Sequence, residues 1–242
     1  MAVVLVTCAG SGVGQSVIDS LKKASGHTLI GCDMSKNVYA RLYCHSFETV
    51  PGIYTEEYLP FLLKLCAKHN VDVLVPGHDY ELLLFSRNKK MFDDAGIKVL
   101  VSHSNLIEIS RDKQLWYEYF ASRGCNIVPT VVLKEFRKNV DNSFFPGIVK
   151  PAGGSASQGI SIVHKPEDIE GLDENLIIQP YLFPDEEDSN YASVVKAVQN
   201  GKFIQASEIS IQVVFNQKSE VKGLFISKNS LKNGVPVTIE PY

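Results

Sequence analysis

The sequence predicts an α/β protein, with a doubly wound parallel sheet in its first part and an α+β arrangement after it. Short apolar runs alternate with helical patterns up to about residue 101, and beyond about residue 129 apolar runs follow one another with little helical pattern between them. Uninterrupted apolar runs are typical of strands covered on both faces of a parallel sheet. Successive strand patterns instead favour antiparallel pairing, so the chain is expected to change architecture near Ser104.

In the first part, helical patterns separate the expected strands. These strands are 3–7, 28–32, 71–75 and 97–101. Apolar residues at helical spacing occur at 13–21 and 59–66, and a further helix is expected to begin at residue 80. The alternation predicts a doubly wound unit, in which ligands bind at the carboxyl ends of the strands.

The second part opens with an amphipathic helix, expected at 111–124. Leu115, Tyr119 and Phe120 share one of its faces, and Gly124 is its expected C-cap. Trp116 is expected to belong to the core. A strand is expected from Pro129 to residue 133.

Beyond this strand the pattern becomes antiparallel. Asn200-Gly201 is expected to be the turn of a β-hairpin between two strand-like stretches. The other expected strands are 148–150, 160–163, 176–179, 221–226 and 235–239.

Composition excludes several classes of protein. The net charge of −3 argues against a general affinity for nucleic acid or anionic membranes, since both need a basic excess. The apolar N-terminus lacks a basic segment before it, and no apolar run approaches the length of a bilayer span, so a cytoplasmic location is expected. The five cysteines include no C-x-x-C pair, so reduced, mostly buried thiols are expected rather than disulfides or a metal site.

A glycine-rich turn at residues 10–14 follows the first expected strand and precedes a helix. Backbone N–H groups at such a turn can hold a phosphate or carboxylate. The turn departs from the dinucleotide fingerprint because position 15 is Gln, although Asp33 ends the second strand where a ribose-binding acid would lie. The alternative is that the glycines only permit close packing of strand and helix.

A second glycine-rich segment, residues 153–159, lies between two expected strands, and Lys150 ends the first of them. Such a loop can close over a polyphosphate while the lysine neutralises phosphate charge. It is not a Walker A loop, because no G-K-[ST] follows and a strand comes next. The alternative is a long hairpin with an ordinary surface lysine.

In this segment and its neighbours the chain resembles ATP-grasp proteins of the carbamoyl-phosphate-synthetase-like kind. The segment 145–160 resembles the nucleotide lid, 111–113 with 124 and 128–130 the opening helix and strand, and 177–182 the hinge strand beside adenine. Residues 232–241 resemble the strand after the phosphate-binding turn, and the first fourteen residues resemble the Rossmann-like domain that precedes ATP-grasp in this branch.

The resemblance implies three parts: a Rossmann-like pre-ATP-grasp domain at 1–106, an ATP-grasp small subdomain at 107–178, and the start of the large subdomain at 179–242. It also implies ATP contacts. Lys113 and Lys150 would contact phosphates, Lys150 also lying near adenine, and Lys232 would lie near the terminal phosphate. Either Glu187 or Asp188 would bind ribose, unless this acidic run is only a solvated loop. The implied lid and adenine-framing residues are Gly153, Gly154, Ser155, Ala156, Ser157, Gly159, Gln179, Tyr181 and Leu182.

In the family, a Glu and a Glu-x-Asn pair that bind magnesium come after the position of Tyr242, so the ATP-grasp domain is expected to be incomplete here and no metal ligand is assigned. The implied parent activity is ATP-dependent ligation of a carboxylate to an amine through an acyl phosphate, with small-molecule substrates and a homodimer or a complementing chain as partner. A non-catalytic nucleotide-binding module is the rival, and a dinucleotide-dependent oxidoreductase is a third alternative. His78, Asp79 and Glu81 are expected to be surface or cap residues, or else to help hold an acceptor.

Overall fold

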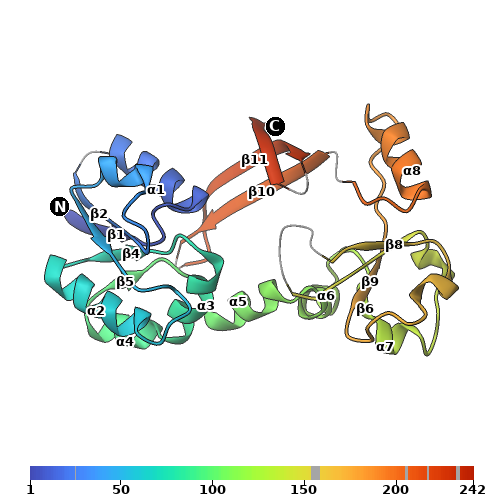
Figure 1. The fold of residues 1–242 in the computed structure, drawn as a ribbon, viewed down its shortest axis with the longest axis horizontal. Helices are drawn as coiled ribbons and strands as arrows, with labels where there is room; N and C mark the ends of the chain where they lie inside the picture. The colour runs from blue at the N-terminus through green and yellow to red at the C-terminus, as the bar shows by residue number, and fades with distance from the viewer. Residues whose placement is uncertain (25, 154–158, 205–206, 217, 233–234) are drawn as a thin grey trace. The chain divides into compact units, whose positions relative to one another are not determined.

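The computed structural model describes residues 1–24, 26–153, 159–204, 207–216, 218–232 and 235–242. The chain divides into two compact units, Met1–Glu108 and Ile109–Tyr242 (Figure 1). Each unit has its own sheet and core, and each is described separately below.

The first unit is a parallel five-stranded sheet with the order β3-β2-β1-β4-β5. Its strand order reverses between β1 and β4, which confirms the doubly wound prediction. The strands are β1 (Ala2–Val6), β2 (His27–Asp33), β3 (Ser46–Thr49), β4 (Val73–Val75) and β5 (Lys98–Val99), and the helices are α1 (Gly12–Lys23), η1 (Tyr39–Tyr43), α2 (Tyr58–His69), α3 (Asp79–Arg87) and α4 (Lys89–Asp94). The sequence did not predict β3, because its four residues are polar except for Phe47 and so form no apolar run.

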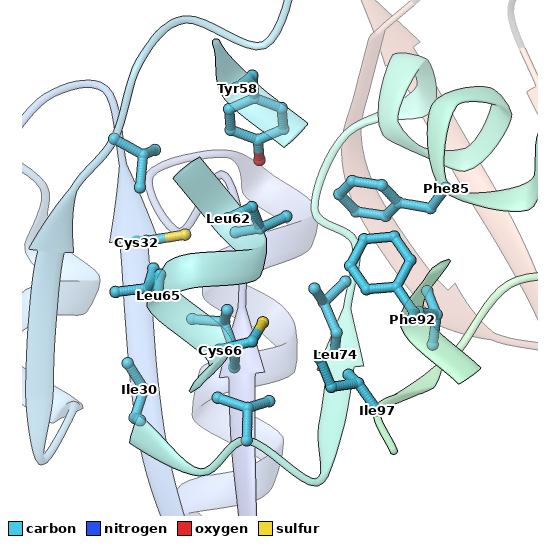
Figure 2. Packing of buried hydrophobic residues seen from close by; sticks show 14 residues of the cluster. Ile30, Cys32, Tyr58, Leu62, Leu65, Cys66, Leu74, Phe85, Phe92 and Ile97 are labelled. Carbon is cyan, nitrogen blue, oxygen red and sulfur yellow. The ribbon is translucent and has the colours of Figure 1, made fainter. Parts of the chain in front are cut away.

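Alternation along β1 sends side chains to both faces of this sheet. Val4 and Val6 pack with Ile18 of α1 on one face. Leu5 packs on the other with residues of α2, α3 and α4, where the rings of Phe85 and Phe92 meet edge to face at 5.5 Å (Figure 2). Both faces are therefore covered, as the uninterrupted apolar pattern required.

A fully buried carboxylate, that of Glu81, joins three elements beneath this core. Its Oε2 accepts from the backbone N–H groups of Gly77 and His78, each at 3.0 Å, and its Oε1 accepts from the Tyr58 hydroxyl. His78 is the N-cap of α3 and forms a capping box with Glu81, so the cap interpretation of both residues is confirmed. The carboxylate therefore fixes the turn after β4 to the start of α2.

Glu81→Ala is expected to lower the free energy of unfolding by about 2–4 kcal/mol, because it leaves buried donors without an acceptor. Glu57→Ala is the matched control, since Glu57 is exposed and makes no capping hydrogen bond. Urea unfolding of both variants and the parent measures the difference. Equal stabilities for the two variants would contradict the role given to Glu81.

The second unit contains a four-stranded sheet with the order β6-β9-β7-β8 and a three-stranded sheet with the order β10-β11-β12, both antiparallel. This confirms the predicted change of architecture. Preceding or interrupting the strands are α5 (Ser104–Arg111), α6 (Lys113–Ala121), α7 (Leu133–Phe136), η2 (Asn142–Phe144), η3 (Pro166–Ile169) and α8 (Tyr191–Gln199). The strands are β6 (Val131–Val132), β7 (Gly147–Lys150), β8 (Ser161–Val163), β9 (Ile177–Pro180), β10 (Ser207–Phe215), β11 (Val221–Lys232) and β12 (Val235–Pro241).

Two sequence predictions in this unit were wrong. Asn200-Gly201 does not turn a hairpin: Asn200 is the C-cap of α8 and Gly201 follows it with φ +67°. An Asn-Gly pair suits a helix end as well as a type I′ turn, because glycine tolerates positive φ in both. Trp116 is not a core residue, since it is 40% exposed and its ring contacts that of Phe120 at a tilt along a helix with no buried residue.

Two element boundaries also differ from the prediction. The helix expected at 111–124 begins at Lys113, because Asp112 caps it and separates it from α5. Its expected end was also wrong, since α6 ends at Ala121 with Ser122 as its C-cap, and Gly124, with φ +75°, lies in the turn that follows. The strand expected at 129–133 is limited to β6, and the buried Leu133 already begins α7.

Candidate functional site

Lys113 and Lys150 are brought together at the start of α6 and the end of β7. The backbone N–H of Lys113 donates to the Ala152 carbonyl at 3.0 Å, and the Lys113 ammonium donates to the same oxygen at 3.2 Å. Asp112 sets the direction of α6, because its carboxylate accepts from the N–H groups of Gln114 at 2.8 Å and Leu115 at 3.0 Å. The helix start is thereby tied to the segment that leaves β7, directly before the glycine-rich residues.

The two ammonium groups lie in a partly desolvated and mutually repulsive environment. Burial lowers the pKa of Lys150, and the nearby charge of Lys113 lowers that pKa further. Burial also lowers the pKa of Lys113, while the Asp112 carboxylate opposes this shift. Within the described part of the chain, no carboxylate raises the pKa of Lys150. An anion would relieve this excess of positive charge, so the pair suits a phosphate group.

The described ends of the glycine-rich segment adjoin this pair. Gly153 lies beside the Arg111 carbonyl, where an added Cβ would be 3.8 Å from the oxygen. Gly159 has φ +67°, and an added Cβ would lie 3.3 Å from the Pro151 ring. The lid positions predicted at Gly154, Ser155, Ala156 and Ser157, and the poor order expected of the segment, lie outside the described residues.

The expected hinge, β9 and the residues after it, pairs with β7 and so runs beside Lys150. Lys150 pairs with Ile177, and Gln179 pairs with Ile148, so Lys150 and Gln179 are on the same face of the sheet. Gln179 Nε2 donates to the Thr130 hydroxyl at 2.7 Å, and Thr130 is buried. This face therefore carries a cation at one end and a fixed amide at the other.

Tyr181 and Leu182 follow the hinge in different environments. The Tyr181 ring is buried near Val194 and Val198, its hydroxyl donates to the Ile204 carbonyl at 2.8 Å, and burial raises its pKa. Leu182 is 64% exposed. Leu182 therefore offers an apolar side chain to a ligand, whereas Tyr181 offers mainly its backbone. Their contact with adenine stays a prediction.

Three further residues were predicted to contact ATP, namely Glu187, Asp188 and Lys232. The Asp188 carboxylate accepts from the N–H of Asn190 at 2.8 Å, directly before α8, and Glu187 is exposed. Lys232 ends β11, where its backbone pairs with Val235. The Lys232 side chain lies outside what the structure describes. The structure gives no ligand contact for these three residues, so their roles stay predictions.

The glycine turn of the first unit, residues 10–14, is held by hydrogen bonds and close contacts to other parts of the protein. Asp33 accepts from the N–H of Gly10 through Oδ2 and from the N–H of Ser35 through Oδ1, both at 2.9 Å. A Cβ on Gly14 would lie 2.4 Å from the Cys8 carbonyl oxygen. Gly14 is therefore needed for close packing of strand and helix, and both oxygens of Asp33 already accept hydrogen bonds. Neither feature favours a dinucleotide.

The sequence did not predict the roles of two residues beside the lysine pair. Asp112 caps α6, and the Ala152 carbonyl accepts hydrogen bonds from Lys113. Asp112 could have been found, because an aspartate directly before a helical pattern is a common N-cap. Ala152 could not, because any residue has a carbonyl. All five cysteines are free thiols, Cys32 and Cys66 buried and Cys125 exposed.

Comparison with known proteins supports the fold. A family model described as PylC-like, N-terminal domain, matches residues 4–100. The structure is similar to N5-carboxyaminoimidazole synthetase from Staphylococcus aureus complexed with ADP, with a TM-score of 0.65, 18% identity and coverage of 97% of this chain and 56% of that one. It is also similar to L-amino acid ligase from Bacillus licheniformis, with a TM-score of 0.63, 13% identity and coverage of 99% and 53%.

A third similar structure is the biotin carboxylase domain dimer of the Hydrogenobacter thermophilus 2-oxoglutarate carboxylase, in complex with MgADP, ADP and bicarbonate, with a TM-score of 0.63, 14% identity and coverage of 96% and 51%. No curated protein sequence matches the chain. The chain thus has the fold of ATP-grasp enzymes and spans about half the length of these structures. This confirms the expected resemblance at the level of the fold, while the carbamoyl-phosphate-synthetase branch stays a prediction.

The described residues lack a metal-binding cluster and a membrane-spanning helix. They contain no group of three or more His, Cys, Asp and Glu side chains arranged to hold a metal ion. None of the described helices is both long and apolar enough to cross a membrane.

The depressed pKa of Lys150 predicts a pH-dependent stability effect. Between a lowered folded pKa and the higher unfolded one, the unfolded chain binds more protons, so stability rises with pH across that window. At pH 7, below the window, the folded protein bears the whole cost of the charged lysine. Lys150→Met is therefore expected to raise Tm at pH 7 and to lose this advantage by about pH 10, near the ordinary lysine pKa.

Thermal unfolding at the two pH values measures this effect. Lys165→Met is the control, because Lys165 is exposed. A Lys150→Met variant with a lower Tm than the parent at pH 7 would show that the ammonium has a stabilising partner.

Proposed function

We propose that this chain is the nucleotide-binding part of an ATP-grasp ligase, whose complete form joins a carboxylate to an amine through an acyl phosphate. The observation that carries the proposal is the convergence of Lys113 and Lys150 beside a glycine-rich segment, with no acid to neutralise Lys150 among the described residues. Two partly buried cations held together cost stability, and a polyphosphate offsets that cost.

In this proposal the chain's residues bind and orient ATP. The ammonium groups of Lys113 and Lys150 hold phosphate oxygens, with Lys232 near the terminal phosphate. The 153–159 segment donates backbone N–H groups to the phosphates, and the hinge at Gln179, Tyr181 and Leu182 lies along adenine. Glu187 or Asp188 accepts from the ribose hydroxyls.

Magnesium would neutralise phosphate charge during transfer. The described residues include no group of three acids, histidines or cysteines for it, so the proposal assigns no magnesium ligand to this chain. What this chain supplies is the positioning of the nucleotide, on which phosphoryl transfer depends heavily.

A second candidate is a nucleotide-binding module without activity of its own, or half of a split enzyme in which a second copy or a complementing chain completes the site. In either form the described residues would supply nucleotide binding, and the two candidates differ in whether this chain alone transfers phosphate. Release of phosphate from ATP in the presence of carboxylate and amine substrates, with the chain alone, separates the two candidates. We place either form in the cytoplasm.

Binding of ADP is the first test. Lys150→Ala is expected to weaken ADP binding by about 1.5–3 kcal/mol, the range for hydrogen bonds to charged groups. Lys165→Ala should leave the affinity unchanged, because that lysine is exposed beyond β8. Isothermal calorimetry measures both. Equal affinities for the two variants and the parent would overturn the assigned role of Lys150.

The same titrations with NAD separate the oxidoreductase alternative. The Asp33 carboxylate already accepts from Gly10 and Ser35, which leaves it poorly placed to take a ribose hydroxyl. ADP should therefore bind more tightly than NAD. Tighter binding of NAD would overturn the proposed function.

A further inference from the structure

A buried hydroxyl, that of Thr130, holds the side chain of Gln179 from the neighbouring strand. Thr130 comes directly before β6, which pairs with β9, the strand that contains Gln179. The hydroxyl donates to the Val128 carbonyl at 3.1 Å and lies 2.7 Å from Gln179 Nε2. A threonine hydroxyl has one hydrogen, and here the Val128 carbonyl accepts it. The hydroxyl oxygen therefore has only lone pairs to offer to Gln179.

This contact decides which end of the Gln179 amide faces Thr130. The amide nitrogen donates and the amide oxygen only accepts, so Nε2 must face the hydroxyl. A rotated amide would set two acceptors against each other and leave the buried hydroxyl oxygen without a donor. Gln179 Oε1 accepts from no donor among the described residues, and it is not buried. The hinge thus presents a preset acceptor that a ligand can reach.

The surface beside this oxygen is apolar. Gln179 pairs with Ile148, and Ile148 pairs with Ile162, so these three side chains are on one face of the sheet, which is also the face of Lys150. Both isoleucines are partly buried. Apolar surfaces with a few placed polar groups are typical of sites for small molecules. A flat ring on the isoleucines would bring the groups at its rim to the preset oxygen.

An acceptor at this position distinguishes one purine from another. The 6-amino group of adenine donates hydrogen bonds, whereas the 6-oxo group of guanine or hypoxanthine only accepts them. The Lys150 ammonium cannot make this distinction, because it donates equally well to N7, an acceptor that these bases share. Selection by the side chains of this face therefore depends on the orientation of the Gln179 amide.

We propose that Gln179 Oε1 accepts from the 6-amino group of the nucleotide base, and that Thr130 is the positioning residue that makes this contact selective for adenine. The assignment rests on the proposed function, because it concerns the same nucleotide site. Thr130 itself does not touch the base. It keeps the amide from rotating, and a rotated amide would present N–H groups that suit a 6-oxo base.

Titration of ADP and IDP into the full chain by isothermal calorimetry tests the assignment, because the two nucleotides differ at position 6 of the base. The parent is expected to bind ADP about tenfold more tightly than IDP, as for one hydrogen bond gained or lost. Thr130→Val keeps the shape of the side chain but removes the hydroxyl, so the two affinities should become equal. Thr130→Ser keeps the hydroxyl and should keep the preference. A merely structural role of Thr130 would instead weaken both nucleotides by the same factor.

Gln179→Leu is a second variant that removes the amide and leaves the buried threonine unchanged. It should also bind ADP and IDP equally, whatever the effect of Thr130→Val on folding. Equal binding of both nucleotides by the parent, or a preference for ADP that persists in Gln179→Leu, would overturn the assignment while leaving the proposed function in place. A parent that binds neither nucleotide would overturn the proposed function itself.

Discussion

The Ala152 carbonyl is the acceptor on which the arrangement of the second unit's site depends. It receives both the backbone N–H and the ammonium of Lys113, so one oxygen fixes the first turn of α6 and the position of its lysine. Ala152 comes two residues after Lys150, so the same contact sets the distance between the two cations. Loss of this geometry would let the lysines move apart into solvent, where their repulsion is screened.

Holding two cations close together lowers the stability of the folded protein, and this cost bears on the role of the two lysines. Burial and the charge of Lys113 both lower the pKa of Lys150, which means that the folded protein disfavours the charged form. Residues that are unfavourable for folding and yet are held in place are often functional. The arrangement therefore agrees with the anion-binding role proposed for the two lysines.

Elements whose residue pattern reflects burial could be predicted from the sequence. The prediction was wrong where one short motif occurs in two kinds of structure. The uninterrupted runs before residue 101 predicted the parallel sheet because both of its faces are covered, whereas β3 is too short and polar to show the pattern. Asn200-Gly201 suits a hairpin and a helix end equally, so the pair could not identify α8. At the candidate site, Lys113 and Lys150 were proposed from the resemblance, but the Ala152 carbonyl that accepts from Lys113 has no sequence signal.

The two units use acidic side chains in the same way. Asp33, Glu81 and Asp112 each accept from backbone N–H groups of a turn or a helix start. These carboxylates hold the backbone in place and are not available as general ligands. Beside Asp112 in the second unit lie the partly buried ammonium groups of Lys113 and Lys150. Among the described residues no carboxylate raises the pKa of Lys150, and this leaves the positive charge that the proposed phosphate binding requires.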